Sequence, residues 1–166
     1  MKKTLRSIAV IMLAALMAFA FAACGEKKNP VKEHDMIAFA KDILTNCSFQ
    51  DEFLAEIEDR NFALTLTKID ADLVADKDGV KQIAYYSSAA YPEMIICVEA
   101  ADEAAAEKVM EKLSAVVERY IKDYTEYGPD QVEKLNTAVK RTSGRYVVLA
   151  VTNDNTAAAK YIDSAL

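Results

Sequence analysis

An uncharged run near the amino terminus, closed by a cysteine, most constrains what this chain can fold into. Three basic residues among the first six are followed by residues 8–23, which carry no charge and end in Ala22-Ala23-Cys24. A basic start, an apolar centre and small residues before a cut are typical of an export signal. We therefore expect residues 1–23 to be removed as a signal peptide and the folded part to lie after them.

The same arrangement resembles the lipobox of bacterial lipoproteins, with Phe21 where an aliphatic residue is usual. The resemblance implies that the Cys24 thiol receives diacylglycerol. Two alternatives stay open, an ordinary secreted protein and an uncleaved anchor, although the apolar run falls just below the roughly 17–25 residues of a spanning helix. Because two acyl chains hold a protein firmly, we expect Cys24 to attach the chain to the lipid bilayer, at the outer face of the cell membrane.

Composition narrows the partners of the exported part. Without residues 1–23, 17 of the 20 basic residues remain against 26 acidic ones. This acidic balance, with no basic stripe, argues against nucleic acid as a partner. The remaining length suits one domain with a real core. We expect a polar tether over residues 24–34, with His34 as a solvated linker residue, and a single domain over residues 35–166.

The two other cysteines, Cys47 and Cys97, lie in apolar surroundings of the sequence. Free cysteine behaves as a small buried hydrophobe. We favour two free thiols, while a disulfide between them stays open because the compartment is oxidising.

Apolar periodicity and turn residues predict the elements. A helix capped by Asp35 comes first, and residues 49–60 are expected to be helical or irregular. Two hairpins follow, each leading into a helix. The expected ranges are a single helical turn at 70–74, a turn at 76–79, strands at 83–88 and 94–99, a long helix from Asp102 to Gly128, a short helix at 130–136, strands at 138–141 and 146–152, and a last helix from Asp154 to Leu166.

The second strand is apolar on both faces, which suggests a central position in the sheet. The two halves, each of two strands, an Asp cap and an Ala-rich helix, form a weak internal repeat. They imply an α+β fold in which an antiparallel sheet of about four strands carries its helices mainly on one face.

Motifs for chemistry are absent from the sequence. There is no serine nucleophile elbow, no cluster of zinc ligands and no glycine-rich phosphate loop. Asp70, Asp72, Asp76 and Asp78 are weak candidates for a calcium site, because their spacing lacks the usual loop register. We therefore expect no cofactor and no catalytic residues.

Tyrosines offer the one candidate interaction surface. Tyrosine combines an apolar body with a polar tip, which suits interfaces. At helical spacing such a stripe is more often the edge of a core. The candidates are Tyr120, Tyr124 and Tyr127 on the long helix and Tyr85, Tyr86 and Tyr91 at the first hairpin.

From Asp70 onward the order of features resembles small lipoproteins of clostridial Gram-positive bacteria that carry a domain of unknown function. The matching segments are Tyr91-Pro92-Glu93-Met94-Ile95, Tyr127-Gly128-Pro129-Asp130-Gln131, Lys134-Leu135-Asn136 and Gly144-Arg145-Tyr146-Val147-Val148. Met94 stands where the family has an acidic or polar residue. The resemblance implies a membrane-attached extracytoplasmic domain and assigns no catalytic residue.

We therefore expect a non-catalytic binding or interaction module of the cell envelope, whose partner is an envelope protein or a small ligand. The alternative is an envelope enzyme that uses carboxylates, with or without a divalent cation.

Overall fold

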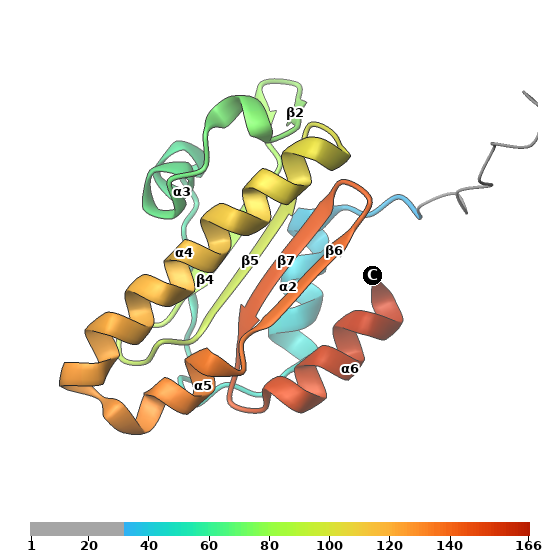
Figure 1. Ribbon diagram of the computed structural model, residues 1–166. Coiled ribbons are helices and arrows are strands. Elements are labelled where there is room, and N and C mark those ends of the chain that lie inside the picture. The colour runs from blue at the N-terminus through green and yellow to red at the C-terminus, as the bar shows by residue number, and fades with distance from the viewer. Residues whose placement is uncertain (1–31) are drawn as a thin grey trace, which may run out of the picture. The chain divides into compact units, whose positions relative to one another are not determined.

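The computed structural model describes residues 32–166 (Figure 1). Within these residues there are five α-helices, seven strands and two single 3-10 turns. In chain order they are α2 (Met36–Asn46), β1 (Ala55–Glu56), α3 (Arg60–Thr67), η1 (Ala71–Leu73), β2 (Asp76–Lys77), β3 (Val80–Lys81), β4 (Ile83–Ser87), β5 (Met94–Glu99), α4 (Glu103–Tyr127), η2 (Pro129–Gln131), α5 (Val132–Asn136), β6 (Val139–Ser143), β7 (Tyr146–Val151) and α6 (Asn155–Ala165).

Five strands form one antiparallel sheet in the order β1-β4-β5-β7-β6. The predicted hairpins are β4–β5 and β6–β7. They are joined by the pairing of β5 with β7, in which Ile96 lies opposite Leu149. The α+β class and the central place of β5 are confirmed. The number of strands is wrong by one, because Ala55 and Glu56 pair with the end of β4 as a short edge strand.

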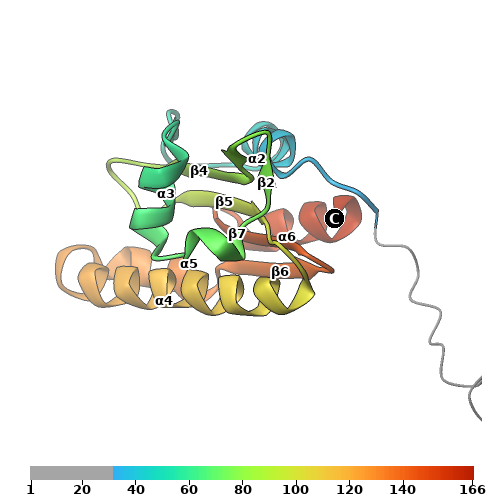
Figure 2. The same ribbon diagram turned by 90° about the horizontal axis from the view of Figure 1, so that it is seen from above.

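Helices cover both faces of the sheet, so the expectation of helices mainly on one face is wrong. One face carries α4, and the other carries α2 and α6 (Figure 2). The cause is visible in β5 and β7, in which every residue is buried. Successive side chains of a strand point to opposite faces, so strands that are apolar throughout must be covered on both sides. The internal repeat therefore does not extend to the placement of its helices.

Two separate cores result. Against α4, the residues Val109, Leu113 and Val116 pack on one set of strand side chains, including Ile96 and Leu149. On the far face, Ile43 of α2 and Ile162 of α6 pack on the alternate set. Full burial of such side chains stabilises the fold by about 1.5–3 kcal/mol each. Because both cores lie within residues 36–166, this part of the chain holds what it needs to fold.

Aspartates begin four of the helices. Asp35 accepts hydrogen bonds from the backbone N–H of Ile37 and Ala38. Asp102 and Asp154 each accept one from the residue three positions on. The predicted starts of α2, α4 and α6 are thus confirmed. The fourth, Asp59, caps α3, a helix that the sequence pattern did not predict.

The described chain begins at one end of the sheet. There the ring of His34 lies 5.2 Å from the ring of Tyr146, at the start of β7, and 5.9 Å from that of Phe39. His34 is half-buried, so its expected role as a solvated linker residue is wrong. At the opposite end lie residues 47–54, 88–93 and 128–138, which we call the loop end.

The predicted signal at residues 1–23 and the lipidation site Cys24 lie outside the described residues. Among residues 32–166, no helix has the length and apolar character to cross a bilayer.

Candidate functional site

Phe53 is the most unusual side chain of the loop end, because 81% of its surface is exposed. Moving a phenylalanine side chain out of water lowers the free energy, so a partner that covered this ring would be favoured. It lies in residues 47–54, which connect α2 to β1.

A buried carboxylate holds this loop in place. Glu93 directly precedes β5 and its side chain is fully buried. Its carboxylate accepts hydrogen bonds from the backbone N–H of Gln50, at 2.8 and 2.9 Å, and of Asp51, at 2.9 Å. Hydrogen bonds to a charged group contribute about 1.5–3 kcal/mol each. A loop tied in this way has little freedom to collapse around Phe53.

Lys134 of α5 supplies the opposite charge. Its Nζ lies 2.9 Å from Glu93 Oε1 and donates a second bond, at 3.1 Å, to the Gln50 side chain. The ammonium also lies 5.8 Å from the ring centre of Tyr91. Both Glu93 oxygens are therefore occupied by donors. This favours a holding role for Glu93 over proton transfer.

Asp51 adds a charge at the surface of the same loop. One of its oxygens accepts from the backbone N–H of Phe53 at 2.9 Å, and the other from the hydroxyl of Ser88 at 2.5 Å. The bond from Ser88, and then that from Phe53, lower the pKa of the Asp51 carboxyl below its usual value. Both donors thus stabilise the negative charge of Asp51.

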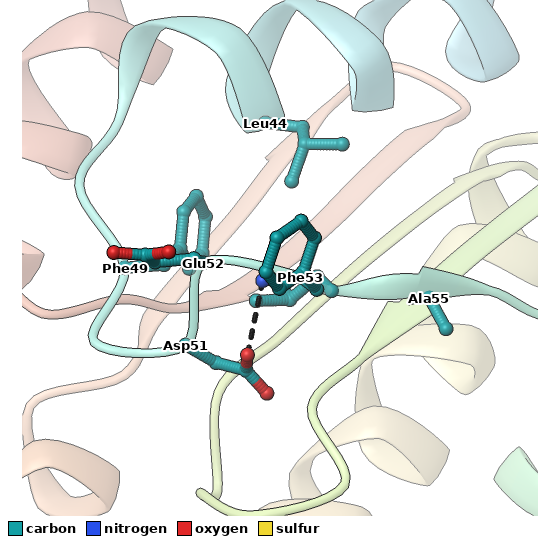
Figure 3. Close-up of a pocket in the computed structure, with 7 residues that line it drawn as sticks. Leu44, Phe49, Asp51, Glu52, Phe53 and Ala55 are labelled. Carbon is teal, nitrogen blue, oxygen red and sulfur yellow. Dashed lines mark hydrogen bonds between the residues drawn. The ribbon is translucent and has the colours of Figure 1, made fainter.

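A groove of about 400 Å³ runs beside Phe53, between this loop and α2. Figure 3 shows Leu44 pointing from α2 toward the ring of Phe53, with the Asp51 carboxylate on the other side of the loop backbone. The groove thus combines apolar and acidic side chains. Its lining consists of Leu44, Phe49, Asp51, Glu52, Phe53, Leu54 and Ala55.

The six candidate tyrosines do not form one surface. Tyr85 and Tyr86 are both buried, and they point to opposite faces of the sheet because they are adjacent in a strand. The rings of Tyr120 and Tyr124 stack with their centres 6.2 Å apart on the α4 side. Tyr127, 87% exposed, stands at the end of α4. Binding by the exposed tyrosines stays a prediction.

Burial changes the chemistry of the two inner tyrosines. It raises the pKa of Tyr86 to about 12, helped by the hydrogen bond of its hydroxyl to Glu56 at 2.8 Å. It also raises the pKa of Tyr85, with Tyr120 adding to the effect. These phenols are core groups.

The four candidate calcium ligands lie along the η1 turn and the β2–β3 hairpin. Asp70 lies 3.5 Å from Lys112, and Asp76 lies 3.5 Å from Lys81. Asp76 also accepts from the backbone N–H of Gly79, which closes the predicted turn. Within residues 32–166 no group of three or more His, Cys, Asp or Glu side chains is placed to hold a metal ion.

Cys47 and Cys97 are free thiols, so the alternative of a disulfide is wrong for this structure. Cys97 is buried in β5 and Cys47 is half-buried at the end of α2. Burial raises the pKa of both thiols, which disfavours the reactive thiolate.

Sequence reasoning missed Phe53, which lines the groove, and Glu93, which holds the loop that carries it. Phe53 lay in a stretch expected to be helical or irregular. Glu93 was one of 26 acidic residues. The sequence did contain one indication of the role of Glu93. It lies between Pro92 and the apolar strand β5, and a charged side chain that is buried beside such a strand needs a partner of opposite charge.

Residues 59–152 match a family described as a domain of unknown function, DUF4358. The match covers more than half of the chain, and the protein belongs to this family. Neither the search of curated proteins nor that of solved structures found a match. The groove residues 44–55 precede the matched segment, whereas Glu93 and Lys134 lie inside it.

Proposed function

We propose that this protein is a lipid-anchored interaction module of the cell envelope, which binds a partner through the groove beside Phe53. One observation carries the binding role. An exposed phenylalanine stands over a groove on a loop whose backbone is fixed by a buried carboxylate. A preorganised apolar group loses little conformational entropy on binding, which favours affinity.

The anchoring role is supported by the predicted export signal at residues 1–23, directly before Cys24, and by the resemblance to clostridial lipoproteins. A lipidated Cys24 would lie eight residues before Lys32. These residues span at most about 29 Å when fully extended. The end of the sheet near His34 would stay close to the outer face of the membrane.

Mass spectrometry of the protein from membranes of its native host tests the anchor. The expected mature terminus is Cys24 carrying a diacylglyceryl group. A bare Cys24, or a retained residue 1–23 segment, would contradict the anchoring role.

Photocrosslinking tests the binding role. A benzoylphenylalanine at position 53 should link to one defined envelope partner in intact cells. The matched control is the same group at position 62, because Phe62 is a phenylalanine that is 50% exposed and lies outside the groove lining. Equal crosslinking from both positions, or none from position 53, would contradict the proposal.

A further inference from the structure

The groove beside Phe53 is not purely apolar, and its charges point to the chemistry of what it binds. Leu44, Phe49 and Leu54 supply apolar walls next to the Phe53 ring, and Asp51 and Glu52 supply two carboxylates. We propose that the occupant is a segment of another envelope protein in which an apolar side chain stands beside a lysine or arginine. This inference rests on the proposed function and specifies its partner.

Asp51 is suited to hold a cation. Its carboxylate accepts one hydrogen bond from Ser88 and one from the backbone of Phe53. An ionised carboxylate has about four acceptor positions, so two remain for a donor from outside. Lys134, a basic residue of the loop end, is already paired with Glu93 at 2.9 Å. Because Lys134 is paired with Glu93, it is not the charge partner of Asp51 or Glu52 in the groove.

The long-range field of the molecule acts in the same direction. After removal of residues 1–23, acidic residues outnumber basic ones by 26 to 17. Such an excess attracts basic partners and speeds their encounter, while like-charged segments are repelled.

The open shape of the groove favours a protein segment over an enclosed small molecule. Pockets for small ligands bury most of the ligand surface. Here Phe53, one of the two phenylalanines of the lining, remains mostly exposed to solvent. A partner that brings its own apolar surface would cover this ring, as interface anchors do.

Three probes of one shape separate the contributions of charge and apolar contact. They are phenethylamine, 2-phenylethanol and 3-phenylpropionate, which at neutral pH are a cation, a neutral molecule and an anion. Each is titrated into the chain from residue 24 onward, with Cys24 replaced by Ser, while backbone amide signals are followed by NMR. We expect signals of residues 44–55 to shift, with the amine binding about two- to fivefold more tightly than the alcohol, the size of one surface ion pair. The anion should bind most weakly.

Two variants localise the effect. The double change of Asp51→Asn with Glu52→Gln should remove most of the preference for the amine over the alcohol, because it removes both carboxylates of the groove lining. The control Glu58→Gln, an exposed acid outside the groove lining, should leave the preference unchanged. Far-ultraviolet circular dichroism confirms that both variants are folded.

The outcomes distinguish this inference from the proposed function. Equal binding of amine and alcohol would overturn the cationic partner and leave Phe53 as an apolar binding element. If none of the three probes binds but position 53 still crosslinks specifically, the inference of a cationic partner is overturned and the proposed function stands. Failure of both experiments would overturn the proposed function as well.

Discussion

The carboxylate of Glu93, buried just before β5, forms an ion pair with Lys134 of α5 across 2.9 Å. The same carboxylate accepts three hydrogen bonds from the backbone of residues 50 and 51. One side chain thereby connects the central strand, the short helix after α4 and the loop that carries Phe53. The groove depends on this connection, since it fixes the backbone of Gln50 to the residue that precedes the central strand.

Removing the charge of either Glu93 or Lys134 should destabilise the fold. Glu93→Gln leaves Lys134 without its charge partner, and Lys134→Met leaves Glu93 as an unpaired buried charge. Each should lower the free energy of unfolding by about 3 kcal/mol. The double variant should cost less than the sum of the two, because no unpaired charge remains. Urea unfolding of all four proteins measures this coupling, and strictly additive losses would contradict it.

The C-terminal end of α3 offers a gain in stability. Lys68 follows the helix with φ at 56°, in the left-handed region that favours glycine. Lys68→Gly should raise the free energy of unfolding by about 1 kcal/mol, because it removes the steric cost of the side chain in this conformation. The control Lys108→Gly, inside α4, should lower it by about 1 kcal/mol. Thermal unfolding compares the two, and a destabilised Lys68→Gly protein would show that the residue is not left-handed in solution.

The alkaline limit of stability should depend on Tyr86. Its pKa is raised from 10.0 to about 12 in the folded protein, first by burial and then by the hydrogen bond to Glu56. A folded pKa above the unfolded one means that the protonated group stabilises the fold. This contribution is complete below pH 10 and is lost as the pH rises from 10 toward 12.

Tyr86→Phe should therefore flatten the fall of stability above pH 10, measured as the free energy of unfolding against pH. Tyr127→Phe is the control, because Tyr127 is 87% exposed and should leave the curve unchanged. An identical slope for wild type and Tyr86→Phe would contradict the assignment.

The two inner cysteines should react at different rates with a thiol reagent. Cys97 is fully enclosed in β5, so its modification should require unfolding, whereas the half-buried Cys47 should react in the folded protein, slowly because its pKa is raised. Counting modified thiols by mass in the Cys24→Ser protein, with and without urea, gives the two rates. Rapid labelling of Cys97, or a protein with no free thiol, would be inconsistent with this structure.

Much of the fold was predictable because its signals are local. The start of α4 follows from Asp102 and its end from Gly128-Pro129, and the spacing of Val109, Leu113 and Val116 predicts its buried face. The ranges of β4 and β5 follow from apolar residues bounded by turns. These features depend on nearest neighbours in the sequence and on the periodicity of one element.

What the sequence did not predict depends on contacts between distant segments. β1 has only two residues and exists because it pairs with β4. α3 buries few side chains, among them Thr67, so its periodicity is weak. The placement of α2 and α6 opposite α4 was implied by the alternate buried residues of β5, such as Ile95 and Ile96, but not by any single helix. The groove required all of these contacts, because Glu93 reaches a loop more than 40 residues away.

Hydrogen exchange at two amides tests most directly the claim that Glu93 holds the Phe53 loop in one conformation. The N–H groups of Gln50 and Asp51 donate to the buried carboxylate. They should exchange at least about a hundredfold more slowly than an unprotected amide, and Glu93→Gln should accelerate them while leaving the amides of β5 protected. Exchange of Gln50 and Asp51 at the unprotected rate in the wild-type protein would contradict a preorganised loop, and with it the binding site proposed here.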